Sequence, residues 1–300
     1  MMLIALIICC LLAQNIVIAS ILEKKSYINT LKAAEMNLHG ACSSLRNFED
    51  QGSCGASWAI SSTGAYADTL CIKKGINIVP SAQWQLNCDK SCPPHPFQTI
   101  CNDGCKGATL YMAATWIGEY GIVSKECVPF QARDGKCYLQ CGNGVQSDIL
   151  VQDMRHDVEN NQYKIDNTSL HSNNSIPSNI EFKLYSHLCA ASTKEKGIQA
   201  MKWALQKYGS LLSGMDVYHN FLNYKGGIYT QQQGLNLGFQ AVRIVGWGTD
   251  SVEGDYWIVH NSFGSNWGEN GRSRVAAGNN LCGLEQEFYF FIPCEDLDIY

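Results

Sequence analysis

The sequence predicts an α+β protein with two lobes. Helical spacing of apolar residues dominates the chain before Gly209, whereas short β-rich segments separated by glycines follow it. Helices that come first and strands that come later are typical of an α+β architecture. With 300 residues, 46% of them hydrophobic, the chain can bury the core of one large domain or of two modest ones.

Three helices and five strands carry this prediction. Apolar side chains share one face at helical spacing in residues 57–72, 110–120 and 195–208, and glycines at positions 75, 121 and 209 end these segments. The β-rich segments are residues 211–217, 227–230, 239–247, 256–261 and 287–292.

Two other regions are expected to be loops. Residues 81–110 are rich in Cys, Pro and Gly, which is typical of a loop region held by disulfides. Residues 142–185 are polar, with many Asn, Ser and Asp and no apolar period, so they are interpreted as a long surface loop.

Residues 1–20 are nearly all apolar and uncharged, and the polar Glu23-Lys24-Lys25 follows them. This pattern predicts a signal peptide; a membrane anchor is the alternative, because the run is almost long enough to span a bilayer. Of the 15 cysteines, thirteen lie beyond this segment, a density typical of disulfide-bonded proteins in an oxidising compartment. An odd number leaves at least one thiol unpaired or bridging between chains.

The sequence argues against a bound metal and a nucleic-acid partner, and it contains two glycosylation triplets. Zinc at Cys101 and Cys105 would need a second pair of ligands, which the sequence does not offer, so no metal or other cofactor is expected. The net charge of −5, without a basic cluster, argues against a nucleic-acid partner. Asn167 and Asn173 begin glycosylation triplets.

The most informative segment is residues 51–58, which read Gln-Gly-Ser-Cys-Gly-Ala-Ser-Trp. The signature around a papain-type nucleophile is Cys-Gly-[Ser/Ala]-Cys-[Trp/Tyr]. Every other position of the signature matches, and Ser57 stands where the nucleophilic cysteine would be.

Further segments extend the similarity over most of residues 40–293. They are Asp103-Gly-Cys-Lys-Gly-Ala108, Asp216-Val-Tyr218 with Phe221-Leu-Asn-Tyr224, Ala241-Val-Arg-Ile-Val-Gly-Trp-Gly248, Tyr256-Trp-Ile-Val-His-Asn-Ser-Phe-Gly264 with Asn266-Trp-Gly-Glu-Asn-Gly271, and Cys282-Gly-Leu-Glu285. In this order and spacing they resemble the papain family of cysteine peptidases, and within it the cathepsin B branch. The resemblance implies a papain-like two-lobe fold, with a helical lobe, a β-barrel-like lobe and a cleft between them.

The resemblance also implies a catalytic site in which both proton-transfer partners are replaced. Ser57 occupies the nucleophile position, at the start of the long central helix, and Gln240 occupies the histidine position. Asn261 matches the asparagine that orients the histidine, and Gln51 matches the glutamine of the oxyanion hole.

This replacement predicts loss of proteolysis. A serine hydroxyl needs a base within hydrogen-bond reach, and the amide of Gln240 cannot take up or return a proton near neutral pH. Two structural interpretations stand beside this one: Ser57 as a helix N-cap, and Gln240 with Asn261 as an amide pair that bridges the cleft. His260 is not expected to act as the base, because neighbours on a strand point to opposite faces.

The binding groove is expected to be better preserved. Gly104, Lys106, Gly107 and Ala108 resemble the segment whose backbone pairs with an extended peptide. Glu287 matches the acid that admits Arg to the specificity pocket of cathepsin B. The alternative interpretation, given equal weight, is that Glu287 is simply an exposed carboxylate on a strand.

Other positions complete the comparison with the family. Phe263 replaces the tryptophan that shields the histidine–asparagine bond, and Trp267 matches the next tryptophan of the motif. The disulfides that the resemblance implies are Cys54–Cys105 and Cys42–Cys71. The paired histidines of the cathepsin B occluding loop have no counterpart in residues 128–137.

The expected organisation is a signal peptide over residues 1–20, a very short pro or N-terminal segment over 21–39, a peptidase-like domain over 40–293 and a tail over 294–300. Within the domain, the helical lobe is expected over about 40–140 and the β lobe over about 186–293.

The predicted function is that of a secreted or endolysosomal, cathepsin B-like protein without peptidase activity, which binds an extended peptide or protein in its cleft. One alternative is an active papain-family endopeptidase with Ser57 as the nucleophile. The other is a secreted matrix or adhesion-type structural protein that uses its outer surface. No nucleic-acid partner and no stable membrane span after signal removal are expected.

Overall fold

The computed structural model describes residues 42–92, 101–137, 154–157, 162–165, 188–191 and 197–293. The chain divides into two compact units, Met1–Asn37 and Leu38–Tyr300, and the described residues all belong to the second. The expected signal peptide, N-terminal segment and C-terminal tail lie outside them, as do Asn167 and Asn173. Among the described residues, no helix is long and apolar enough to cross a membrane.

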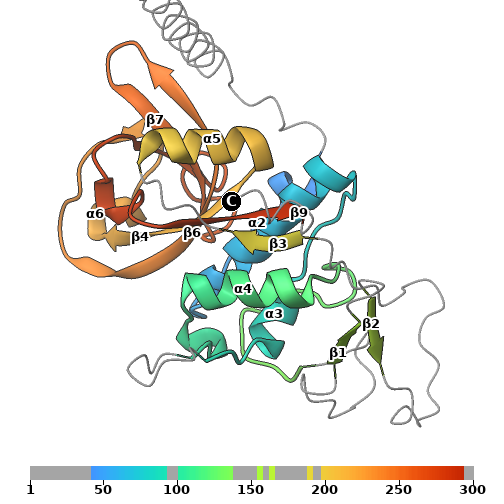
Figure 1. The fold of residues 1–300 in the computed structure, drawn as a ribbon. Helices are drawn as coiled ribbons and strands as arrows, with labels where there is room; N and C mark the ends of the chain where they lie inside the picture. The colour runs from blue at the N-terminus through green and yellow to red at the C-terminus, as the bar shows by residue number, and fades with distance from the viewer. Residues whose placement is uncertain are drawn as a thin grey trace, which may run out of the picture. The chain divides into compact units, whose positions relative to one another are not determined.

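The first half of the domain is built around α2, Ser57–Lys74, which has almost no exposed residue before its last turn. It packs against β6 of the sheet as well as against α3 and α4 (Figure 1). Gly75 ends α2 in the left-handed conformation, with φ 66°, where a residue without a Cβ is least strained. The helices predicted over 57–72 and 110–120 are thereby confirmed as α2 and as α4, Leu110–Tyr120.

The expectation of a loop throughout residues 81–110 is wrong. Residues Ala82–Cys88 form the helix α3, whose first turn is capped by Ser81, because its Oγ accepts a hydrogen bond of 3.0 Å from the backbone N–H of Trp84. Every residue of α3 is buried, so tertiary packing stabilises a helix too short to be recognised by its periodicity. The other described residues of 81–110 do carry disulfides, and they include the short 3₁₀ helix η3, Gly104–Lys106.

The second half forms a seven-stranded sheet with the strand order β3-β9-β4-β6-β7-β8-β5. The strands are β3 Leu188–Ala191, β4 Leu211–Tyr218, β5 Ile228–Tyr229, β6 Asn236–Asp250, β7 Gly254–His260, β8 Arg272–Ala276 and β9 Phe288–Pro293. Two helices accompany them, α5 Ile198–Tyr208 and α6 His219–Leu222. Each of the five predicted strands is present. The sequence missed β8, because its two arginines obscure the alternation of buried Ser273 and Val275.

The polar region 142–185 is also not purely loop. Met154–Asp157 and Gln162–Ile165 form β1 and β2, an antiparallel pair of their own. Pairing satisfies the backbone hydrogen-bonding groups whatever the side chains are, so polar residues can form such a pair without the apolar alternation that is typical of a half-buried strand.

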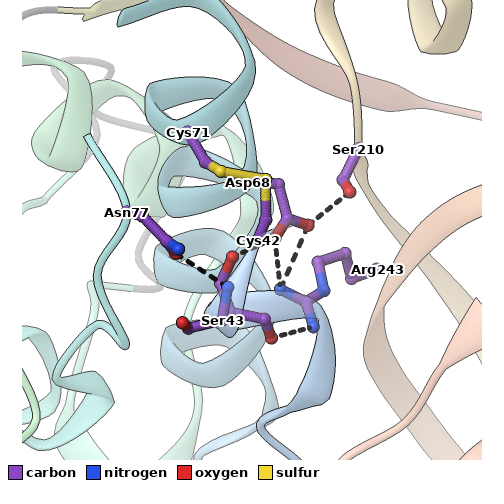
Figure 2. Close-up of a disulfide and its surroundings, with 8 residues drawn as sticks. Cys42, Ser43, Asp68, Cys71, Asn77, Ser210 and Arg243 are labelled. Atoms are coloured by element: carbon purple, nitrogen blue, oxygen red, sulfur yellow. Dashed lines mark hydrogen bonds and ion pairs between the residues drawn. A yellow bond between two sulfur atoms is a disulfide. The ribbon is translucent and has the colours of Figure 1, made fainter. Parts of the chain in front are cut away.

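A buried ion pair joins the helical half to the sheet (Figure 2). Asp68 of α2 is fully buried, and its carboxylate lies 3.1 Å from the guanidinium of Arg243 on β6, which is 5% exposed. The hydroxyls of Ser44 and Ser210 donate to the same carboxylate. The disulfide Cys42–Cys71 ties the first described residue to α2 beside this cluster.

Replacement of Gly64 by alanine tests how rigid this junction is. A Cβ at this position would lie 2.5 Å from Nη1 and 2.9 Å from Cζ of Arg243. We expect Gly64→Ala to lower the free energy of unfolding by about 1–3 kcal/mol through overpacking, although alanine in a helix is otherwise favoured by about 1 kcal/mol. Urea denaturation measures the change. Thr115→Ala on the exposed face of α4 is the control, and an equal effect of both substitutions would contradict the expectation.

Candidate functional site

Ser57 is the first residue of α2, at the end of the helix that faces β6. The N-cap residue is Ala56, which makes no side-chain capping bond, so the interpretation of Ser57 as the N-cap is wrong. Ser57 is 8% exposed, and its Oγ accepts a hydrogen bond of 3.2 Å from the backbone N–H of Ala241. The hydroxyl therefore contacts the backbone next to Gln240 rather than capping its own helix.

The side-chain amide of Gln240 forms its hydrogen bonds with residues other than Ser57. Its Nε2 donates to Oε1 of Gln51 at 2.9 Å, to Oδ1 of Asn261 at 3.1 Å and to Oγ of Ser262 at 2.8 Å. Three of the four residues predicted for the catalytic site thus meet in one hydrogen-bond network, and Ser57 adjoins it through Ala241. The pairing of Gln240 with Asn261 is the amide bridge considered from the sequence.

Ser262 completes this network and was missed in the sequence analysis. Its hydroxyl donates to Oε1 of Gln51, and its backbone N–H donates to Oδ1 of Asn261 at 2.8 Å. The only signal in the sequence is its position directly after Asn261. A fully buried serine whose hydroxyl both donates and accepts holds the two amides in a fixed relative orientation.

The other side of Asn261 faces a small cavity. Its Nδ2 has no hydrogen-bond partner among the described residues, and the residue is 4% exposed. The cavity has a volume of about 20 Å³ and is lined by Asn261 together with Glu49, Ser61, Arg243 and others. A polar cavity of this size is large enough for one water molecule.

His260 points away from the network, as strand alternation predicts. Its Nδ1 lies 2.8 Å from Nη2 of Arg243, and its Nε2 accepts from Nε of Arg272 at 2.8 Å. Its ring also lies 4.8 Å from that of Phe48. Among the described residues, no titratable side chain is hydrogen-bonded to the Ser57 hydroxyl.

The segment expected to pair with a peptide lies beside the start of α2. The disulfide Cys54–Cys105 and the hydrogen bond of 2.8 Å from the N–H of Gly55 to the carbonyl of Cys105 connect the two. The carbonyl of Gly104 accepts from Nε1 of Trp58 at 3.0 Å. Gly107, with φ 110°, and the partly buried Ala108 follow η3. The backbone of this segment is thereby held in place next to Ser57.

Lys106 of the same segment forms an exposed ion pair with Asp103 at 2.8 Å. The hydrogen bond to Asp103 raises the pKa of Lys106, and the hydrogen bond from Lys106 lowers the pKa of Asp103. Both side chains are open to solvent, so the pair contributes little to stability.

The aromatic residues expected near the site contact one another. The rings of Phe263 and Trp267 are 5.2 Å apart and nearly perpendicular, and Nε1 of Trp267 donates to the carbonyl of Leu222 at 3.0 Å. Phe263 also forms a backbone bridge with Asp50, which precedes Gln51.

Glu287 precedes β9 and is exposed, and its carboxylate accepts a hydrogen bond of 3.4 Å from the hydroxyl of Tyr289. Burial, and secondly the charge of Glu287, raise the pKa of Tyr289 to about 12. The ring of Tyr111, itself 56% exposed, lies 6.3 Å from that of Tyr289. The carboxylate is therefore open to solvent beside aromatic groups.

The two disulfides implied by the resemblance, Cys42–Cys71 and Cys54–Cys105, are present. Cys88–Cys137 and Cys92–Cys101 are two more, and Cys127 is also disulfide-bonded. Because Cys101 and Cys105 each belong to a disulfide, neither offers a thiolate to zinc. No group of three or more potential metal ligands occurs in the described part of the chain. Cys282 is a free, buried cysteine, and burial raises the pKa of its thiol to about 11.

Comparison with known proteins gives a consistent result. The family model for the papain family cysteine proteases matches residues 34–292. The chain is 31% identical to cathepsin B-like cysteine proteinase 4 of Caenorhabditis elegans over 259 residues, which cover 84% of this chain and 72% of the relative. It is 30% identical to cathepsin B-like cysteine proteinase 1 of Ostertagia ostertagi, over 82% of this chain and 67% of the relative.

Solved structures agree with the sequence relatives. Procathepsin B S9 from Trypanosoma congolense superimposes with a TM-score of 0.63 and 27% identity, over 85% of this chain and 74% of the other. Bromelain from Ananas comosus, solved with the inhibitor E64, superimposes with a TM-score of 0.60 and 25% identity, over 85% of this chain and 95% of the other. The predicted papain-like α+β fold is thus confirmed. The chain belongs to the papain family of cysteine proteases, and within it to the cathepsin B-like proteins.

Proposed function

We propose that this protein is a cathepsin B-like peptidase homologue that has lost proteolysis and acts by binding a peptide or an extended protein segment in its cleft. The observation that carries the proposal is the hydrogen bonding of Ser57 and Gln240. Among the described residues, the Ser57 hydroxyl is hydrogen-bonded to the backbone N–H of Ala241 and to no acid–base group, and the Gln240 amide donates to Gln51, Asn261 and Ser262.

Amide hydrolysis needs an activated nucleophile and a group that returns a proton to the leaving amine. A hydroxyl without a base stays protonated, and a carboxamide does not exchange protons near neutral pH. His260, which directly precedes Asn261 in the sequence, forms hydrogen bonds with Arg243 and Arg272. The chemistry of the site therefore supports binding without turnover.

The parts that would hold a peptide are better preserved than those that would cut it. The backbone of residues 104–108 is tied to the start of α2 by a disulfide and by the bond from Gly55 to Cys105. The Glu287 carboxylate is open to solvent and suits a cationic side chain of the ligand. The apolar segment at residues 1–20 supports secretion or delivery to an endolysosomal compartment, where the disulfides form.

The test is a comparison of the purified protein with Ser57→Ala on Arg-Arg and Phe-Arg peptide substrates. We expect no difference between the two proteins, and no rate above that of buffer beyond trace contamination. Thiol-blocking reagents should also leave the result unchanged. Turnover by the unaltered protein that disappears in Ser57→Ala would overturn the proposal and establish serine chemistry on this fold.

A further inference from the structure

The cavity beside Asn261 is lined by three parts of the chain that are far apart in sequence. Glu49 comes from the segment before α2, Ser61 from α2 itself, and Arg243 and Asn261 from the sheet and the residues that follow it. Its volume of about 20 Å³ admits one body about as large as a water molecule. Asn261 meets Gln240 through Oδ1, so the cavity at its other side is separate from that contact.

Two side chains that line the cavity are hydrogen-bond donors without a partner. Nδ2 of Asn261 has none among the described residues. The orientation of this amide is fixed, because its Oδ1 accepts from Nε2 of Gln240 at 3.1 Å and from the N–H of Ser262 at 2.8 Å. Ser61 is 3% exposed, and its hydroxyl forms no hydrogen bond within the part of the chain that the structure describes. Buried polar groups are nearly always hydrogen-bonded, so both donors indicate an acceptor bound in the cavity.

The buried groups around the cavity carry an excess of positive charge. Arg243 lines the cavity and pairs with Asp68 (Figure 2). The half-buried Arg272 donates to Nε2 of His260 and to the carbonyl of Leu45 at 3.3 Å, and it pairs with no carboxylate among the described residues. Burial, and secondly the charge of Arg243, lower the pKa of Arg272. Two guanidinium groups against one carboxylate leave a positive charge beside the cavity.

The carboxylate on the cavity wall does not supply the missing acceptor. Glu49 forms an ion pair with Lys125 at 2.6 Å and accepts from Nδ2 of Asn47 at 3.1 Å. A water molecule in the cavity would accept from the two free donors, but it would also bring two hydrogens that need acceptors of their own. An anion only accepts, and it balances the charge of the arginines. The surplus of donors and of positive charge therefore favours an anion over water.

We propose that this cavity binds one monatomic, monovalent anion, for which chloride is the physiological choice. Nδ2 of Asn261 and the hydroxyl of Ser61 donate to the anion, and Arg243 supplies the opposite charge. Polyatomic anions are excluded by the size of the cavity. The bound anion holds the Asn261 amide in the orientation in which it meets Gln240. The inference does not depend on the proposed function, because it concerns an ion behind Asn261 and no peptide.

The experiment follows the thermal unfolding of the purified protein while sodium chloride replaces sodium gluconate at constant ionic strength, so that charge screening stays the same. Gluconate is too large for the cavity. We expect the unfolding midpoint to rise with chloride and to level off, by about 3–6 °C once the anion is about tenfold above its dissociation constant. Sodium bromide should act in the same way. A midpoint that does not depend on which anion is present would overturn the proposal.

Two variants connect the effect to the cavity. Ser61→Ala removes one donor and keeps a good helix former, and it should raise the half-saturating chloride concentration about tenfold. Thr115→Ala, on the exposed face of α4, is the matched control and should behave like the unaltered protein. Asn261→Asp places a carboxylate oxygen at the cavity and should abolish the chloride effect. If Asn261→Asp does not fold, Ser61→Ala decides, and an unchanged half-saturating concentration in it would contradict the proposal.

Crystals grown in sodium bromide locate the ion directly. We expect an anomalous peak in contact with Nδ2 of Asn261 and Oγ of Ser61, and its loss in Asn261→Asp or, failing that variant, its weakening in Ser61→Ala. A cavity that contains only water under these conditions, or bromide bound only elsewhere on the protein, would refute the site.

Discussion

The double variant Ser57→Cys, Gln240→His is expected to hydrolyse Arg-Arg or Phe-Arg peptide substrates at least about 10³-fold faster than the unaltered protein. A positioned acid–base group alone contributes about 10²–10⁴-fold, and the restored thiol adds a nucleophile that ionises near neutral pH at a helix N-terminus. The surroundings are in place: Oδ1 of Asn261 now accepts from the residue at position 240 at 3.1 Å, and Gln51 lies next to it.

The single variants are the matched controls. Ser57→Cys lacks the imidazole, and Gln240→His lacks the thiol, so each should gain far less than the pair, because catalytic groups that act as a unit are strongly non-additive. The measurement is the hydrolysis rate of the two single variants and the double variant, all at the same substrate concentration below saturation. These rates show whether the gain of the pair exceeds that of the single variants. A double variant no faster than either single variant would show that the groove itself no longer positions a scissile bond.

Replacing Arg243 with methionine is expected to lower the free energy of unfolding by about 3–5 kcal/mol, the usual cost of leaving one partner of a buried ion pair uncompensated. Asp68 is fully buried, and Arg243 and two serine hydroxyls are its partners. Burial lowers the pKa of Arg243, and the charge of Asp68 opposes that change. Without the guanidinium, the carboxylate stays buried without its cationic partner. Denaturant unfolding followed by intrinsic tryptophan fluorescence measures the loss.

Two control variants test whether the loss of stability in Arg243→Met is due to the burial of the ion pair. Lys106→Met removes one partner of the exposed pair with Asp103 and should change stability by less than about 1 kcal/mol. Asp68→Leu with Arg243→Met removes both charges and should be less destabilising than the sum of the two single variants. If Arg243→Met costs no more than Lys106→Met, the ion pair does not hold α2 to the sheet.

Much of the fold was readable from the sequence because it depends on local patterns. The helix at residues 110–120 has the predicted bounds, since Thr109 and Gly121 flank an apolar segment that is helical by its spacing. The strands were found but their lengths were not. β6 begins at Asn236, three residues before the predicted strand, and the exposed Asn236 and Gly238 belong to it because they pair with β4 rather than because they face the core. The missed helix α3 depends on burial of all its residues, which no local pattern reports.

For the candidate site, too, part could be predicted from the sequence and part was decided only by the tertiary structure. The prediction that Ser57 and Gln240 stand at the positions of the thiol and the imidazole came from the order of residues alone, because the chemical nature of a side chain does not depend on the fold. What those side chains bind was decided only in three dimensions: Gln51, Gln240 and Ser262 are far apart in the chain and become hydrogen-bond partners only where α2 meets β6 and the end of β7. Hydrogen bonds act over about 3 Å, so only the packed structure determines which amide meets which hydroxyl.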